Sequence, residues 1–284
     1  MKTILFSRAS AMLAVLALVV AFGCSNQELA PAKNSAIPAE ILANFEELGF
    51  DVSDIAKVPH HHPVSEEYLG DRYLLEGDIL ISEDQMNEML SSGVDHLGAL
   101  GEQYRTTNLV TGTPRVINIV GYNKKKNALT NNMKTALQMA VDNYNDLNIG
   151  LTFNLTFSTN TAGADITVYK VGGPAGGSAG FPTGGNPYDQ VLLNSGLKNY
   201  SVDVIEHVIT HEIGHCLGLR HTDYFNRSLS CGTGGNEGDA GIGAIHIPGT
   251  PTGFDPTSIM LSCFNSSVTG EFGQYDVVAL EHLY

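Results

Sequence analysis

The sequence predicts an α/β domain, in the broad sense that includes α+β folds, because strand-like and helix-like segments alternate along it. Residues 114–120, 151–157 and 165–169 alternate apolar and polar side chains, which is typical of half-buried strands. Residues 127–147 and 202–217 instead repeat their apolar side chains at helical spacing. A chain of 284 residues is also long enough to bury a sizeable core.

The other elements follow from local patterns of the same kind. Residues 39–50 have helical periodicity, whereas the tract His60–His62, which precedes a proline, predicts a solvated loop, with incidental metal affinity as the alternative. Residues 172–187 contain seven glycines and predict an exposed loop. Residues 188–194 predict a further strand, and residues 274–284 predict a C-terminal helix.

The segment His211–His221, with the sequence HEIGHCLGLRH, holds three imidazoles at fixed offsets. In a helix, His211 and His215 lie one turn apart on the same face, where both rings can bind one zinc ion. A continuing helix would carry His221 about 15 Å past the first histidine. Gly218 accepts the left-handed conformation that ends a helix, so the chain can turn back. The spacing predicts one catalytic zinc held by His211, His215 and His221, with a fourth position open.

Glu212 follows the first histidine directly and is not needed as a ligand. A carboxylate beside a zinc-activated water can act as general base and then pass the proton to a leaving nitrogen. The alternative is that these are ordinary surface or core histidines on a helix. The pattern favours a catalytic site with Glu212 as its base.

The pattern H-E-x-x-H-x-x-G-x-x-H resembles the signature of the metzincin zinc peptidases. More narrowly, the sequences THEIGH and GLRH look like those of the bacterial dual-action HEIGH metallopeptidases. The resemblance implies a twisted mixed sheet, a backing helix at 127–147, an active-site helix and a small C-terminal subdomain that ends in a helix. It also implies that Met260 forms a Met-turn beneath the metal, with a plain core methionine as the alternative. Ser262 stands where the astacin type of turn has a tyrosine, so we expect no tyrosine at the transition state.

In metzincins the strand that corresponds to residues 188–194 is the edge strand that pairs with an extended substrate. The glycine-rich loop at 172–187 resembles a matrixin loop, but the ligands for a second, structural zinc are missing, so we expect none. A calcium site is left open, with no residue pattern to support one.

The charge of −15 is unevenly distributed. Residues 25–105 carry 16 acidic and 4 basic side chains, which separates them from the rest of the chain. We expect a signal peptide at 1–23, a tether at 24–38, an acidic propeptide-like segment at 39–105 and the peptidase domain at 106–284. An acidic chain without a basic aromatic patch argues against a nucleic-acid partner.

Within the acidic segment, Tyr73–Leu80 resembles the Phe-x-Gly-Asp element of astacin propeptides, with Leu75 in place of the phenylalanine. The resemblance implies that Asp78 binds the zinc and keeps a precursor latent, and Gly77 would let the backbone approach. The alternative is a Gly-Asp turn that joins two strands. A cysteine switch is excluded, because no cysteine lies between Cys24 and Cys216.

The N-terminus predicts export. Two basic residues precede the apolar run 11–22, which is too short for a comfortable membrane span and suits a signal peptide. The run ends at Cys24 in a pattern that resembles a bacterial lipobox, so we expect a lipidated cysteine, with an ordinary signal peptide or an uncleaved anchor as alternatives. Ser25 favours the outer membrane in many Gram-negative bacteria. The expected location is the cell envelope or cell surface, with release after processing left open.

Three cysteines remain in the exported part. Cys231 and Cys263 flank the segment between the zinc motif and the Met-turn, and we expect a disulfide between them, with three free thiols as the alternative. Cys216 lies in the active-site helix and is expected to be a buried thiol, with a disulfide that involves it as the open alternative.

Taken together, these features predict a monomeric, exported zinc endopeptidase that cleaves protein or peptide substrates and touches the membrane only through its lipid. One alternative is a surface lipoprotein that uses the same shell to bind without turnover, and Glu212 argues against it. Zinc-dependent hydrolysis of a non-peptide amide is a third possibility.

Overall fold

The computed structural model describes residues 37–91, 103–235, 244–251 and 253–284, all within one unit, Lys33–Tyr284. The expected signal peptide, Cys24 and nearly all of the tether lie outside the described residues. Within the described part of the chain, no helix is long and apolar enough to cross a membrane.

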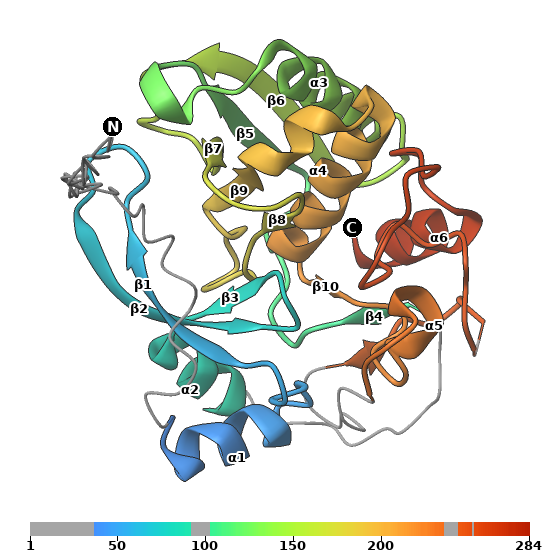
Figure 1. Cartoon of the computed structure of the whole chain (residues 1–284). Helices are drawn as coiled ribbons and strands as arrows, with labels where there is room; N and C mark the ends of the chain where they lie inside the picture. Colours follow the sequence, from blue (N-terminus) through green and yellow to red (C-terminus); the bar gives the residue numbers. More distant parts are fainter. Residues whose placement is uncertain (1–36, 92–102, 236–243, 252) are drawn as a thin grey trace, which may run out of the picture. The chain divides into compact units, whose positions relative to one another are not determined.

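A five-stranded mixed sheet forms the centre of the C-terminal part, residues 103–284 (Figure 1). Its strands stand in the order β6-β5-β7-β9-β8. They are β5 (Arg115–Tyr122), β6 (Leu151–Ser158), β7 (Ile166–Val171), β8 (Gly177–Ser178) and β9 (Gln190–Asn194). The pairs formed by β5, β6, β7 and β9 are parallel, and only β8 runs antiparallel to its neighbour. The α/β class with a mixed sheet is confirmed.

Two long helices, α3 (Asn131–Asn145) and α4 (Val202–Leu217), pack against each other and against this sheet (Figure 1). Both begin where a hydroxyl group can satisfy a free N–H: the Thr130 side chain accepts from Met133 N, and Ser201 accepts from Val204 N. Every residue of α4 from the third onward is buried. The sequence indicated one buried side of this helix; its other faces are covered as well.

The glycine-rich stretch 172–187 is not an exposed loop throughout, and residues 188–194 are not the edge of the sheet. Residues 179–182 are buried, and β8 returns antiparallel to β9 and becomes the edge strand. The glycines allow this close return. A Cβ atom at Gly177 would lie 2.5 Å from Glu212 Oε1.

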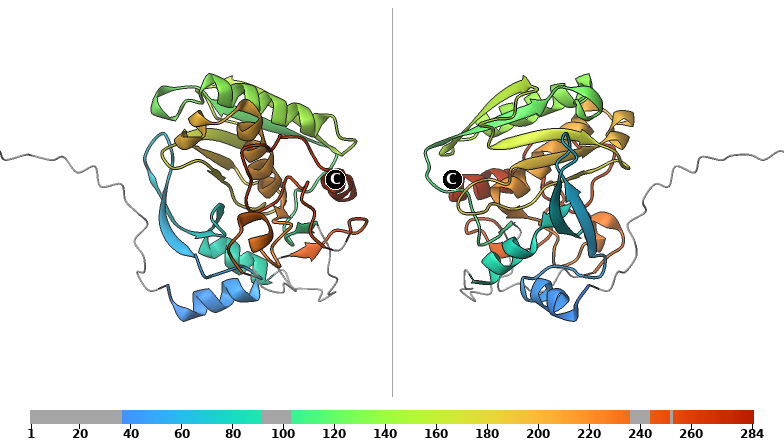
Figure 2. Two further views of the ribbon diagram at one scale, coloured as in Figure 1. Left: turned by 45° about the vertical axis from the view of Figure 1, so that its right-hand side comes forward. Right: turned by 90° about the vertical axis from the view of Figure 1, so that its left-hand side faces the viewer.

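The N-terminal segment, residues 37–91, contains α1 (Ala39–Glu47), an antiparallel sheet of β1 (Ala56–His61), β2 (Tyr68–Leu75) and β3 (Ile79–Ile81), and α2 (Glu83–Ser91). Its apolar core includes Phe45, Phe50, Leu75 and Met86, and Phe181 of the C-terminal part belongs to the same core. The tip of the β1–β2 hairpin, blue in Figures 1 and 2, reaches η1 (Lys125–Asn127) through an ion pair between Glu66 and Lys126.

The expected loop at His60–His62 is wrong, because the first two of these residues end strand β1. Neighbouring residues of a strand point to opposite faces, so His60 is buried while His61 is exposed. The three imidazoles therefore do not gather into one site.

A small sheet in the order β10-β4-β11 joins the start of the C-terminal part to the region that follows α4. It consists of β4 (Tyr104–Arg105), β10 (Leu219–Arg220) and β11 (Ile245–His246). Strand β4 ends at Arg105, where the acidic segment is expected to end, and both of its partner strands lie further along in the C-terminal part. The boundary at residue 105 stays a prediction. The chain continues through η2 (Ser195–Asn199), α5 (Ser228–Cys231) and the C-terminal helix α6 (Gln274–Leu283).

Candidate metal centre

Three histidines meet at the C-terminal end of α4. His211 and His215 leave the helix one turn apart, and their ring centroids are 4.6 Å apart. The helix ends at Gly218, whose φ of +106° is the left-handed conformation that the sequence predicts. The chain then turns back through β10 and brings the His221 ring to 5.0 Å from His215 and 5.3 Å from His211.

Each imidazole is fixed through its Nδ1 atom. Ile259 O lies 2.9 Å from His211 Nδ1, and Leu219 O lies 2.8 Å from His215 Nδ1. The third ring, His221, has Glu76 Oε2 at 3.1 Å from its Nδ1. All three partners are acceptors, so each ring carries its proton on Nδ1 and directs the lone pair of Nε2 toward the other two.

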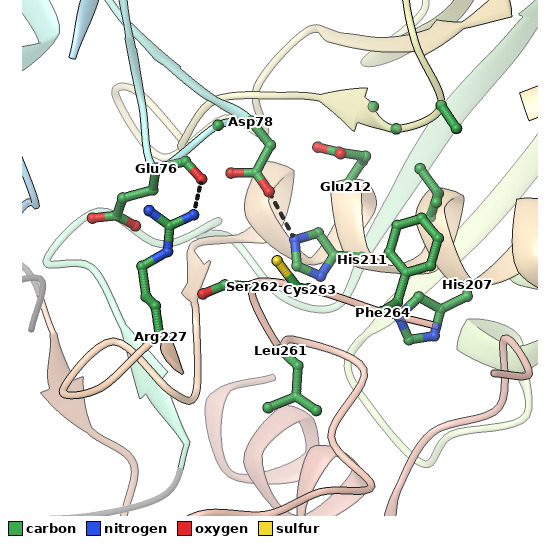
Figure 3. A pocket seen from close by; sticks show the side chains of 15 residues that line it. Glu76, Asp78, His207, His211, Glu212, Arg227, Leu261, Ser262, Cys263 and Phe264 are labelled. Carbon is green, nitrogen blue, oxygen red and sulfur yellow. Dashed lines mark hydrogen bonds and ion pairs between the residues drawn. The ribbon is translucent and has the colours of Figure 1, made fainter. Parts of the chain in front are cut away.

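Asp78 brings a carboxylate to the same point. Its Oδ2 lies 3.6 Å from His211 Nε2 (Figure 3). The same oxygen lies 3.3 Å from His221 Nε2. One ligand atom from each of Asp78, His211, His215 and His221 lies within 4.8 Å of the others. Asp78 follows Gly77 in the turn between β2 and β3. The Gly-Asp turn and the contact with the histidines, which are alternatives in the sequence, therefore occur together.

This arrangement fits a metal ion, because four acceptors gathered so closely would repel one another without a cation between them. Burial, together with His211 and His221, lowers the pKa of His215 well below its ordinary value, which keeps this ring in its neutral, ligating form. Burial raises the pKa of Asp78, but positive charge on the neighbouring imidazoles, chiefly His221, would hold it below its usual range. With the rings neutral, a metal ion between them would supply the positive charge that keeps Asp78 ionised.

Glu212 lies beside the metal centre and is not one of its four donors. Its side chain is 2% exposed, and its Oε2 has no hydrogen-bond partner among the described residues. Burial, followed by the nearby Asp78 carboxylate, raises the pKa of Glu212 well above its ordinary value. The carboxylate rests against Gly177 at the edge of the sheet, where any larger residue would overlap it.

Met260 is fully buried beneath α4. A Cβ atom at Gly214 would lie 2.5 Å from Met260 Sδ, so the glycine of HEIGH makes room for the sulfur. The turn that carries Met260 is held by Asp276, which accepts from Ile259 N and from Ser258 Oγ at 2.8 Å each.

The geometry of the three cysteines in the described residues matches the sequence expectation. Cys231 and Cys263 are joined by a disulfide with a Cα–Cα distance of 5.0 Å, and Cys216 is a free, buried thiol. Ser262, in place of a tyrosine, donates from its N and Oγ to Asp223 Oδ1.

A pocket of about 280 Å³ opens beside His211 and Glu212, and its wall includes Val208, Leu261 and Phe264 (Figure 3).

Three residues of the site were not identified from the sequence: Glu76, Gly177 and Asp276. Glu76 stands two residues before Asp78. Its carboxylate could have been identified together with Asp78, because both belong to the turn that is expected to contact the metal. Asp276 lies in the first turn of α6, which had the simpler explanation of a helix cap.

The fold and the site define a metallopeptidase with a three-histidine centre. A model of the dual-action HEIGH metallo-peptidase family matches residues 73–284, and the chain belongs to this family. The kinship indicated by the HEIGH motif is confirmed.

Two solved structures of myroilysin are similar to this chain. The first has a TM-score of 0.41 and 15% identity, and the match covers 61% of this chain and 94% of that one. The second has a TM-score of 0.41 and 14% identity over 69% and 95% of the two chains. No curated protein matches the chain.

Proposed function

We propose that this protein is an exported, zinc-dependent endopeptidase that is made as a latent precursor. The observation that carries the proposal is the convergence of the Nε2 atoms of His211, His215 and His221, with the free carboxylate of Glu212 next to them. Three imidazoles are a protein ligand set that zinc takes in catalytic sites.

Glu212 is the general base. A bound zinc ion would polarise the peptide carbonyl and lower the pKa of a water molecule. Glu212 would take the proton of that water at Oε2 and pass it to the leaving nitrogen. Asp78 contributes to the raised pKa of this carboxyl, so departure of Asp78 would shift Glu212 toward its basic form. A site that only binds has no use for such a base, which favours an enzyme over a binding module.

Latency is supported by two contacts of the β2–β3 turn. Asp78 places a carboxylate oxygen where the Nε2 atoms of the histidines meet. Strand β3 pairs with Ala179, which directly follows the edge strand β8: Leu80 N donates to Ala179 O at 2.7 Å, and Ala179 N donates to Asp78 O at 3.0 Å. An extended peptide substrate would use the same main-chain groups. Residues 78–80 therefore stand where both the metal and the backbone of a substrate would be engaged.

Export and anchoring rest on the N-terminal sequence. The basic residues and apolar run before Cys24 support a lipoprotein signal, and the disulfide between Cys231 and Cys263 is of the kind that persists outside the cytoplasm. We place the protein in the bacterial cell envelope, acting on protein or peptide substrates.

The test compares three full-length, zinc-loaded proteins in a casein digest: the parent, Asp78→Ala, and Asp78→Ala combined with Glu212→Gln. Asp78→Ala should cleave faster than the parent, and the added Glu212→Gln should lower that rate about 10²–10⁴-fold while zinc stays bound. A chelator should stop cleavage. Undiminished cleavage in the double variant would remove Glu212 from the mechanism, and equal rates for the parent and Asp78→Ala would remove the latch.

A further inference from the structure

Glu76 binds both the metal-centre histidine His221 and two arginines of the C-terminal part. Its carboxylate is 1% exposed; Oε2 accepts from His221 Nδ1 at 3.1 Å, and Oε1 accepts from Arg220 Nη2 at 2.6 Å. Arg227 Nη2 donates to the main-chain oxygen of Glu76 at 2.8 Å (Figure 3). Glu76 thus contacts the C-terminal part through both carboxylate oxygens and its carbonyl oxygen.

The backbone at Glu76 supports a specific role for this residue. Its φ is +56°, a conformation that is uncommon for a residue other than glycine. This conformation places Glu76 and Asp78 so that they reach the same imidazole. Glu76 Oε2 lies at the Nδ1 atom of His221, and Asp78 Oδ2 lies at its Nε2 atom. One ring is therefore held between two carboxylates of a single three-residue turn.

The two carboxylates have opposite consequences for a metal ion. Asp78 approaches the nitrogen that would bind the metal and competes with water or substrate for the open position. Glu76 approaches the opposite nitrogen, where a carboxylate fixes the tautomer, orients the ring and raises its basicity as a ligand. Only the first contact blocks the site; the second supports it.

We propose that Glu76 is a positioning residue of the metal centre, so that the segment which closes the site also holds one of its ligands in place. The proposal rests on the metal site of the proposed function. A second path links the same segment to the site: Phe50 stacks on Phe181 at 6.2 Å between ring centroids, and Phe181 meets the His215 ring edge-on at 5.6 Å. The activated enzyme should therefore keep Glu76 in place while Asp78 moves away.

The test measures zinc affinity rather than activity, in full-length protein that carries Asp78→Ala, so that Asp78 cannot itself bind the metal. Into this parent we introduce Glu76→Gln, Glu76→Asp and the control Asp51→Asn. In Glu76→Gln, Arg220 should attract the amide oxygen and leave an NH₂ group facing His221 Nδ1–H. Zinc affinity, from competition with a chelator, should fall about 10–100-fold, and the Co²⁺ absorption spectrum should change.

Glu76→Asp separates positioning from folding. Aspartate keeps the negative charge beside Arg220 and accepts a positive φ more readily than glutamate, but its carboxylate is one methylene shorter. Its zinc affinity should fall to a value between those of the parent and Glu76→Gln, and this variant decides the question if Glu76→Gln does not fold. Asp51 lies in the same segment, with Oδ2 4.0 Å from Arg227 Nη1, and Asp51→Asn should change zinc affinity less than about twofold.

The outcomes separate this proposal from the proposed function. If the Asp78→Ala parent binds no zinc, the metal centre itself is wrong. If the parent binds zinc and both folded Glu76 variants bind it equally tightly, the positioning role is wrong. A loss in Asp51→Asn as large as that in Glu76→Gln would mean that the segment acts only through general stability, which also overturns the proposal.

Discussion

Gly214, in the last turn of the buried helix α4, allows a direct test of how Met260 packs against this helix. A Cβ atom at this position would lie 2.5 Å from Met260 Sδ and 3.3 Å from Met260 Cε. The Ile259 carbonyl just before the methionine holds His211 Nδ1. Gly214→Ala therefore combines a favourable change in helix propensity with an unfavourable steric overlap between the new Cβ and Met260.

The magnitudes predict a change of sign between two backgrounds. Alanine in a helix interior is about 0.5–1 kcal/mol more stable than glycine, whereas overpacking of a core costs about 1–3 kcal/mol. Gly214→Ala alone should thus lower the free energy of unfolding by about 1 kcal/mol. Met260→Ala removes a fully buried side chain and should cost about 2–5 kcal/mol. In the Met260→Ala protein, where the sulfur is absent, Gly214→Ala should instead raise the free energy of unfolding by about 0.5–1 kcal/mol.

Thermal unfolding of the four proteins, all in excess chelator, measures this cycle without a contribution from metal binding. For a domain of this size, 1 kcal/mol corresponds to about 2–4 °C. Gly214→Ala should lower the unfolding temperature by that amount in the parent and raise it by about 2 °C in the Met260→Ala protein. An equal loss in both backgrounds would show that the glycine does not serve to accommodate Met260.

Three further predictions concern neighbouring residues. Gly177→Ala places a Cβ 2.5 Å from Glu212 Oε1 and should reduce casein cleavage by the Asp78→Ala protein while its zinc content, measured by elemental analysis, is unchanged. Asp276→Asn would turn an NH₂ group toward donors and should cost about 3 kcal/mol in urea unfolding; a loss below about 1 kcal/mol would contradict this role. Burial, and then the charge of Glu271, raise the pKa of Glu206 to about 7. The protonated carboxyl therefore favours the folded state, fully so below about pH 4.5, and this contribution to the free energy of unfolding is lost as the pH rises through 7. Glu206→Gln cannot titrate, so its unfolding temperature should rise relative to the parent between pH 5 and pH 8, and a constant difference would argue against the raised pKa.

The parts of the fold and site that the sequence predicts well depend on local geometry. The spacing of His211 and His215 requires only a helix, and the return of His221 requires only that Gly218 end it. Residues 202–217 form the helix with the bounds that the periodicity indicates. These inferences use interactions between residues a few positions apart, for which the helical repeat is a sufficient guide.

The errors concern contacts between distant segments. Glycines at 172–187 indicated exposure, yet Gly177 is there because Glu212, from another element, lies against it. Strand β9 was expected at the edge from the resemblance to metzincins, and no local pattern shows that the two residues of β8 pair beside it. His60 was expected in a loop because three adjacent imidazoles precede a proline, whereas its burial depends on where β1 packs. In each case a pairing partner remote in sequence decides the outcome.

The turn at 76–78 shows why two interpretations of one segment can both be correct. A Gly-Asp turn between strands and a metal-site contact were alternatives in the sequence, but the turn is what delivers Asp78 to the histidines. The turn also places Glu76 at the opposite side of the His221 ring, because residues two apart in it can reach the same imidazole. An inhibitor that only occupies a site can leave without consequence. If Glu76 also positions a metal ligand, as proposed, its loss would weaken the metal centre. The proposed latency then requires an activation step that displaces Asp78 locally and leaves Glu76 bound to His221.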